Sequence, residues 1–244
     1  MRPLWIALVA GIFAVLCWPQ SPDAGTKSLD PLVADPAHYH LEFQNQWVRV
    51  IRDRTGPHES EHLHHHPEPG AVVVYLTDQN TRQTSEDGTI RIVRHKAGDV
   101  RWSPASTHKG ENQNDAPFEY IGVEPKPSAS GAASQQAKYD TSRDGLIVEP
   151  QHYHLEFENE LVRVIRFTLE PHEKGVMHTH PPTGAILVAL TAQNTHQLLS
   201  DGTTRDNQHK AGEVWWGAPN IAHQDENMLG TRTVLIRIEL KQAR

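Results

Sequence analysis

The stretch Met177–Ala185 reads MHTHPPTGA, and one residue separates its two histidines, His178 and His180. On an α-helix, residues i and i+2 point to different sides, whereas on a β-strand they project from the same face. A His-x-His pair on a strand can therefore hold one metal ion between its two imidazoles. Pro181 favours this geometry, because a proline biases the residue before it toward an extended backbone.

This stretch belongs to one half of an internal repeat. Residues 36–52, PAHYHLEFQNQWVRVIR, recur at 150–166 as PQHYHLEFENELVRVIR, at an offset of 114 residues. A repeat of this length has the size of a domain rather than of a solenoid unit. We predict one domain at 30–125 and a second at 146–244. The segment 126–145, rich in Pro, Ser, Ala, Gly and Gln, is then the linker.

The N-terminus resembles an export signal. Residues 4–18, LWIALVAGIFAVLCW, form an apolar run after Arg2, shorter than the roughly 20 apolar residues of a membrane span. We predict that residues 1–24 are a signal peptide or an uncleaved N-terminal anchor, which makes the protein periplasmic or secreted. The only cysteine, Cys17, lies in this segment, so the remainder of the chain can form neither disulfides nor cysteine-ligated metal sites.

The composition narrows the classes of partner. Of the 244 residues 37% are hydrophobic and 22% charged, and the formal net charge is -7. Binding to nucleic acid or to an anionic membrane relies on clustered Lys and Arg, so this balance argues against both. We expect a small-molecule substrate or ligand, and no membrane contact beyond the N-terminal segment.

The local patterns indicate an all-β fold. Residues 71–77, AVVVYLT, and 185–191, AILVALT, are short apolar runs of strand length. Asp-Gly pairs at 87–88 and 201–202 are turn signals between strands, and residues 231–240, TRTVLIRIEL, alternate well. Many short strands with regular turns predict a sandwich or a barrel.

A third histidine follows each His-x-His pair at a matched distance. His108 comes 42 residues after His66, and His223 comes 43 residues after His180, because the second copy has one extra residue after Trp216. Three neutral imidazoles suit Zn, Fe, Cu or Ni, and three protein ligands leave coordination positions open, as in catalytic sites. We predict two metal sites, formed by His64, His66 and His108 and by His178, His180 and His223.

These motifs resemble the two sequence motifs of the cupin superfamily. The first motif contains the His-x-His pair, and the second runs from a glycine through a proline and a histidine to an asparagine. The second motif is matched by residues 98–112, GDVRWSPASTHKGEN, and 212–227, GEVWWGAPNIAHQDEN. The spacing departs by one residue between Pro and His in both copies, and between Gly212 and Pro219 in the second. The resemblance implies two tandem cupin barrels, which are double-sheet jelly rolls with the metal inside.

The chain also departs from the cupin pattern in its ligands. The first cupin motif normally continues to a glutamate that serves as a fourth ligand, but the pairs here are followed by PEPGA (67–71) and PPTGA (181–185). We therefore expect three-histidine sites. The missing glutamate weakens a manganese oxalate-oxidase interpretation. It leaves non-haem iron dioxygenases of the three-histidine cupin type, or zinc sites.

We accordingly expect an exported, metal-binding bicupin, a metal-dependent enzyme of the non-haem dioxygenase type that acts on a small polar molecule. Lyase or isomerase chemistry ranks next, and a non-catalytic protein that binds a metal or a small ligand is the alternative. Each domain would hold one divalent ion, with iron ranked before zinc. Asn112 and Asn227, four residues after the third histidine on the same strand face, are expected to orient the ligands.

The other histidines and the tryptophans are assigned to structural roles. The two HYH segments, at 38–40 and 152–154, are expected to be a polar edge strand. We expect solvent exposure for the histidines beside turns, and core filling for Trp102, Trp215 and Trp216. No residue of the sequence stands out as a general base. The histidines beside turns are His58, His95, His172 and His209.

Overall fold

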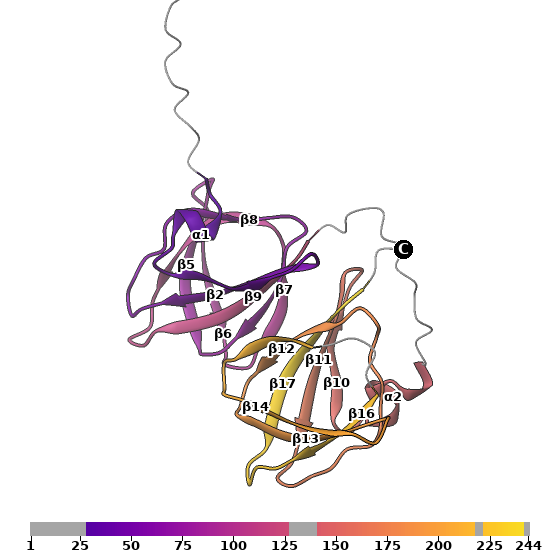
Figure 1. Ribbon diagram of the computed structural model, residues 1–244. Coiled ribbons are helices and arrows are strands. Elements are labelled where there is room, and N and C mark those ends of the chain that lie inside the picture. Colours follow the sequence, from indigo (N-terminus) through magenta and orange to yellow (C-terminus); the bar gives the residue numbers. More distant parts are fainter. Residues whose placement is uncertain (1–27, 127–140, 218–221, 242–244) are drawn as a thin grey trace, which may run out of the picture.

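The computed structural model describes residues 28–126, 141–217 and 222–241. Within these ranges the chain forms two β-barrels that lie side by side, each made of two sheets (Figure 1). The all-β prediction is confirmed, because the described helices are single short turns. The predicted export segment, 1–24, and most of the predicted linker, 126–145, lie outside the described residues. No helix in the described part of the chain is long and apolar enough to cross a membrane.

The first barrel follows the short helix α1 (Pro31–Ala34), which Asp30 caps by accepting a hydrogen bond from the backbone N–H of Leu32. A five-stranded sheet in the order β1-β2-β9-β4-β7 faces a four-stranded sheet in the order β3-β8-β5-β6. The strands are β1 (Tyr39–Gln44), β2 (Val48–Thr55), β3 (His64–His66), β4 (Ala71–Tyr75), β5 (Gln79–Ser85), β6 (Ile90–His95), β7 (Val100–Ser103), β8 (Ser106–Asn112) and β9 (Phe118–Pro125).

The second barrel repeats this design after the 3-10 turn η1 (Thr141–Arg143) and helix α2 (Gly145–Val148). Its larger sheet has the order β10-β11-β17-β12-β15, and its smaller sheet has the order β14-β13-β16. The strands are β10 (Tyr153–Glu158), β11 (Val162–Leu169), β12 (Ala185–Ala189), β13 (Gln193–Leu199), β14 (Thr204–His209), β15 (Val214–Gly217), β16 (His223–Asn227) and β17 (Thr233–Leu240).

On the last strand of the second barrel, alternate side chains pack in two different places. On β17, Ile236 and Ile238 belong to one large apolar cluster, whereas Leu235 and Arg237 line the cavity inside the barrel. Successive residues of a strand point to opposite faces, so both faces of this strand are buried. This double burial explains why the strand is apolar on one face and mixed on the other.

The large apolar cluster joins the two barrels. Its buried members come from the outer faces of both five-stranded sheets, including Val50 and Ile121 of the first barrel and Val164 and Ile236 of the second. The sheets therefore pack against each other as a continuous core, an intramolecular pseudo-dimer. Because each Å² of apolar surface removed from water stabilises the folded state by roughly 25 cal/mol, this shared core holds the two barrels together.

Two reciprocal hydrogen bonds border this core. The Arg52 side chain donates from Nη2 to the carbonyl oxygen of Gly212 at 2.7 Å, and Arg166 donates from Nη2 to that of Gly98 at 2.7 Å. Arg52 and Arg166 are equivalent residues of the repeat, as are Gly98 and Gly212. The interface is therefore nearly symmetric, as in an isologous dimer.

Replacing a residue of the shared core should cost stability. Ile238→Ala removes a fully buried side chain at the interface between the barrels, so we expect the free energy of unfolding to fall by about 2–5 kcal/mol. Denaturant unfolding of the purified protein measures this. Ile92→Ala, at a position 47% exposed, is the matched control and should cost less than about 0.5 kcal/mol. Equal costs for the two variants would contradict a tightly packed interface.

Candidate metal centres

Strand pairing brings the distant histidine of each repeat to the His-x-His pair. In the first barrel, β3 pairs antiparallel with β8, and His64 lies directly opposite His108. In the second barrel, His178 and His223 form an isolated β-bridge and exchange both backbone hydrogen bonds, at 2.9 and 3.1 Å. Residues directly opposite on neighbouring strands have their side chains on the same face, so the third imidazole joins the first two inside the barrel.

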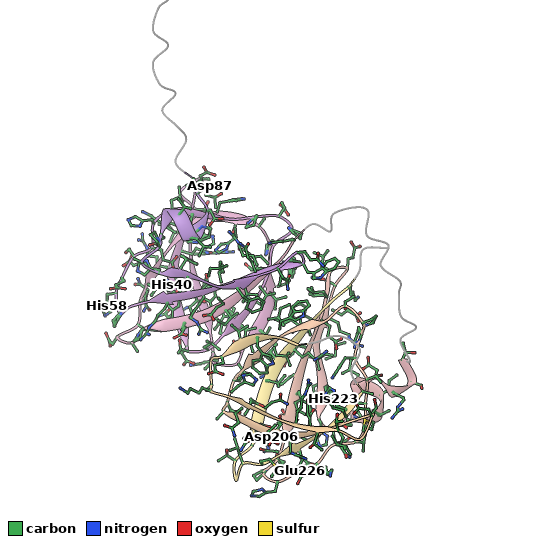
Figure 2. The ribbon with its side chains drawn as sticks, in the orientation of Figure 1. His40, His58, Asp87, Asp206, His223 and Glu226 are labelled. Carbon is green, nitrogen blue, oxygen red and sulfur yellow. The ribbon has the colours of Figure 1, made fainter. Side chains whose placement is uncertain are left out.

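The six predicted histidines form two compact groups. In each group, one ligand nitrogen from every histidine lies within 4.8 Å of the other two. All six side chains are buried except that of His66, which is half-buried. Figure 2 shows His223 within the second barrel, whereas His40 and His58 are exposed side chains of the first.

Hydrogen bonds in the first barrel select the ligand nitrogen of each histidine. Every Nδ1 has an oxygen partner, so Nδ1 can carry the proton while Nε2 presents its lone pair. The donor set therefore fits a divalent transition metal. The contacts are His64 Nδ1 to His62 O at 2.9 Å, His66 Nδ1 to Glu124 Oε1 at 3.3 Å, and His108 Nδ1 to Ser106 Oγ at 3.0 Å.

In the second barrel, two imidazole nitrogens face each other closely. The Nε2 atoms of His178 and His180 are 3.1 Å apart. The Nδ1 atom of His178 lies 3.0 Å from the carbonyl oxygen of Val176, and that of His180 lies 3.3 Å from Glu239 Oε1. With both Nδ1 atoms protonated, two lone pairs point at each other, and a cation between them removes the repulsion. This arrangement fits a metal ion.

Burial favours the neutral form of three of these imidazoles, those of His64, His108 and His180. Burial and the nearby His66 lower the pKa of His64 to about 4. Burial and the neighbouring histidines lower the pKa of His108 to about 2, and burial and Arg237 lower the pKa of His180 well below its usual value. Only a neutral imidazole binds a metal, so at neutral pH protons compete little for these three nitrogens.

A tyrosine hydroxyl lies beside each metal centre, and sequence reasoning missed both. The hydroxyl of Tyr39 is 3.1 Å from His64 Nε2, and that of Tyr153 is 2.8 Å from His178 Nε2. Burial raises the pKa of both hydroxyls well above the usual value, so they remain protonated donors. The tyrosine at the centre of each HYH segment was the available signal, since alternation along a strand turns its side chain to the opposite face from the histidine that follows it, His40 or His154, which is exposed.

The sequence analysis also missed a carboxylate in the second barrel. Asp225 Oδ2 lies 3.3 Å from His223 Nε2, and Asp225 is only 6% exposed. Burial opposes its ionisation, but the adjacent His223 lowers the pKa of Asp225 below its usual value. Asp225 lies two residues after His223 and hence on the same strand face, which was the sequence signal. The expected absence of a carboxylate after the His-x-His pair holds, but this one comes from β16 instead.

The two asparagines of the second motif hold loops. Asn112 and Asn227 are fully buried, and each donates from Nδ2 to three backbone carbonyl oxygens. Their side-chain oxygens accept from Asn114 N–H and Leu229 N–H. These contacts fix the turns that follow β8 and β16. The asparagine hydrogen bonds in the described part of the chain hold loops and do not reach the histidines, so a role in orienting the ligands stays a prediction.

Several histidines assigned to solvent or to a polar edge are packed instead. β1 and β10 are edge strands as predicted, but His38 and His152 are buried and bonded to Asp35 and Glu149. The carboxylates explain the burial, because a paired imidazole loses little on leaving water. His58 and His172 are exposed as expected.

The two remaining histidines correct the sequence analysis. His95 stacks on Tyr75 with ring centroids 4.2 Å apart, and His209 stacks on Trp215 at 3.6 Å, so both histidines are half-buried rather than exposed. The tryptophans pack against core clusters as predicted, Trp102 and Trp216 against the shared one and Trp215 against that of the second barrel, where it also lines the cavity. Stacking of flat rings stabilises them at the cavity wall. Pro219 of the second motif lies outside the described residues.

Each metal centre opens into a cavity of its barrel. The cavity of the first barrel has a volume of about 50 Å³ and that of the second about 100 Å³. Each is lined by two of the three histidines and by the tyrosine of its HYH segment. These volumes hold several water-sized groups, which suits a small ligand.

The metal centres predict metal-dependent stability. Because a metal binds the folded protein and not the unfolded chain, adding iron(II) or zinc should raise the melting temperature, and a chelator should reverse the shift. His64→Ala/His66→Ala and His178→Ala/His180→Ala should each lose one ion per chain in elemental analysis. His40→Ala/His154→Ala, which removes exposed histidines, is the matched control and should retain both ions. Equal metal loss in this control would indicate adventitious surface binding.

Comparison with known proteins places the fold. No family model and no curated protein matches the sequence, but solved structures match the fold. AerE from Microcystis aeruginosa matches over 84% of this chain and 93% of its own, at 14% identity and a TM-score of 0.56. Salicylate 1,2-dioxygenase from Pseudoaminobacter salicylatoxidans, solved as adducts with gentisate, matches over 80% and 68%, at 11% identity and a TM-score of 0.52.

A decarboxylase structure is similar to the same extent. Oxalate decarboxylase from Bacillus subtilis matches over 79% of this chain and 68% of its own, at 15% identity and a TM-score of 0.52. At these identities the likeness establishes the fold and not the activity. Together with the two histidine groups, it shows that the chain has the cupin fold in two tandem copies, a bicupin with one metal-suited three-histidine group in each barrel.

Proposed function

We propose that this protein is a metal-dependent enzyme of the non-haem dioxygenase type that acts on a small polar molecule. The observation that carries the proposal is the oriented donor set of the first barrel. Three Nδ1 atoms are bonded to oxygen, so three Nε2 atoms are available to one ion in a cavity. An ion held by three imidazoles would supply Lewis-acid or oxygen-activating chemistry. Iron is the metal we propose first, and zinc next.

The residues around the ion support catalysis rather than storage. Tyr39 can donate a hydrogen bond to an oxygen of a ligand bound beside His64, and its raised pKa keeps the proton on the hydroxyl. Tyr39 also bonds to the hydroxyl of Tyr120, at 3.1 Å, which fixes the position of its oxygen. A donor held in place before the reaction stabilises developing negative charge more than a mobile one.

The similarity to salicylate 1,2-dioxygenase supports the choice of oxygen chemistry, because that neighbour shares the two-barrel fold. Oxalate decarboxylase, which shares the fold to the same degree, supports lyase chemistry as the next choice. Export to the periplasm or the cell exterior is also part of the proposal and rests on the apolar run at residues 4–18.

Oxygen uptake tests the proposed function. Iron(II)-loaded protein should consume oxygen in the presence of one member of a panel of small hydroxy, keto and phenolic acids. The His64→Ala/His66→Ala and His178→Ala/His180→Ala variants identify the barrel responsible. Metal binding with no turnover of any panel member by the iron or the zinc form would favour the alternative, a non-catalytic binding protein.

Replacing the tyrosine should separate binding of the metal from turnover. Tyr39→Phe removes the hydroxyl beside His64, so we expect metal content to be retained and turnover in the first barrel to fall by roughly 10- to 100-fold. Tyr153→Phe is the matched variant of the second barrel. Elemental analysis and the oxygen electrode give the two readouts. A loss of metal in Tyr39→Phe would instead make this residue part of the metal-binding structure.

A further inference from the structure

The two cavities differ in where an arginine lies in their walls. In the first barrel, Arg101 on β7 lines the cavity, and the equivalent residue of the second barrel is Trp215. In the second barrel, Arg237 on β17 lines the cavity, and the equivalent residue of the first barrel is Gly122. One arginine thus lies on β7 in the first barrel and on β17 in the second. Arg205 on β14 also lines the second cavity, but it is an exposed residue whose Nε donates to Gln197 Oε1.

Arg237 is a buried cation with an unused donor. Its side chain is 7% exposed, and its Nε donates to Glu239 Oε1 at 2.8 Å. The Nη2 atom is buried and has no hydrogen-bond partner among the described residues. A guanidinium cannot lose its proton, so a buried N–H without an acceptor is costly. An acceptor placed in the cavity beside Nη2 would remove this cost.

The carboxylate beside Arg237 cannot satisfy it fully. Glu239 also accepts from Arg163, through Oε2 at 2.7 Å, so one carboxylate serves two guanidinium groups. Arg163 has a second partner in Asp144 at 2.6 Å, whereas Arg237 forms an ion pair with Glu239 alone among the residues that the structure describes. The contact with Glu239 uses the Nε side, which leaves the Nη2 end of the guanidinium for a ligand.

The second cavity has room for such a ligand. Gly217 and Leu187 both line this cavity, and a Cβ at Gly217 would lie 2.4 Å from Leu187 Cδ1, so the glycine gives its space to the Leu187 side chain. Trp215, held flat against His209, forms an apolar wall. His180 and His223 line the same cavity, whose volume is about 100 Å³. Arginine and the metal-suited histidines therefore face one small space.

We propose that the second barrel binds a small carboxylate, with a carboxylate oxygen accepting a hydrogen bond from Arg237 and the other polar end of the molecule directed toward His180 and His223. This inference rests on the proposed function and names the substrate class of the second barrel. A planar carboxylate matches the planar guanidinium and supplies the missing acceptor. The first barrel lacks this arrangement, because its Arg101 lies on another strand and donates from Nε to the hydroxyl of Tyr75.

Calorimetric titration of the zinc-loaded, full-length protein tests the inference. The probes are oxamate and oxamide, which have similar shapes but differ by one carboxylate. We expect oxamate to bind at least about 10-fold more tightly than oxamide, and Arg237→Met to weaken oxamate binding by about 10-fold or more while changing oxamide binding less than about twofold. Arg101→Met, the matched variant of the first barrel, should retain the oxamate binding that depends on Arg237.

Additional variants and probes show whether the carboxylate assignment or the proposed function is wrong. Arg237→Lys keeps the positive charge but loses the planar pair of N–H donors of the guanidinium, so it should weaken oxamate binding by several fold. This variant replaces Arg237→Met in the test if Arg237→Met does not fold. Two results would overturn the carboxylate assignment while leaving the proposed function in place. In both, the protein retains its metal, but it either shows no preference for oxamate over oxamide or binds oxamate with unchanged affinity in both Arg237 variants. Tighter, Arg237-dependent binding of inorganic phosphate would also overturn it. Elemental analysis showing no metal would overturn the proposed function and this inference with it.

Discussion

The antiparallel pairing of the strand that carries His-x-His with the strand that carries the third histidine is the constraint on which both metal centres depend. It places His64 opposite His108 and His178 opposite His223, in register. A slip of one residue would turn the third imidazole out of the barrel, because side chains alternate between faces. One ligand nitrogen of each histidine in a group lies within 4.8 Å of the other two, so a single cation can bind all three only in the folded barrel. Stability and metal binding are therefore coupled.

The interface between the barrels protects this register. Each five-stranded sheet has its inner face in a barrel and its outer face in the core shared by the two copies. Strands buried on both faces cannot shift without losing apolar contacts on one of them. The reciprocal hydrogen bonds of Arg52 and Arg166 repeat the constraint at both ends of the interface. The duplication thus supplies each barrel with a support that a single barrel would need from a second chain.

Within this framework the two cavities differ at pairs of neighbouring positions. Glu61 pairs with Gly110 in the first barrel, and the equivalent pair in the second is Gly175 with Asp225. The carboxylate lies before β3 in the first barrel and on β16 in the second, and in each barrel the partner is a glycine. At Gly110 a Cβ would lie only 2.7 Å from Glu61 Oε2, so the glycine leaves room for this carboxylate. Arg101 and Arg237 also lie on different strands, so the barrels differ in chemistry while their larger sheets keep the same strand order.

The sequence by itself determined the features that are periodic or repeated. The His-x-His parity, the matched third histidine, the Asp-Gly turns and the 114-residue repeat required only strand geometry to interpret. Tertiary structure decided what depends on side chains from distant strands. It placed the hydroxyls of Tyr39 and Tyr153 beside the histidines, buried His38 and His152 against carboxylates, and left Nη2 of Arg237 without an acceptor among the described residues. The reason is physical, since spacing along a strand fixes the direction of a side chain, whereas its partners and its burial are fixed by the strands packed around it.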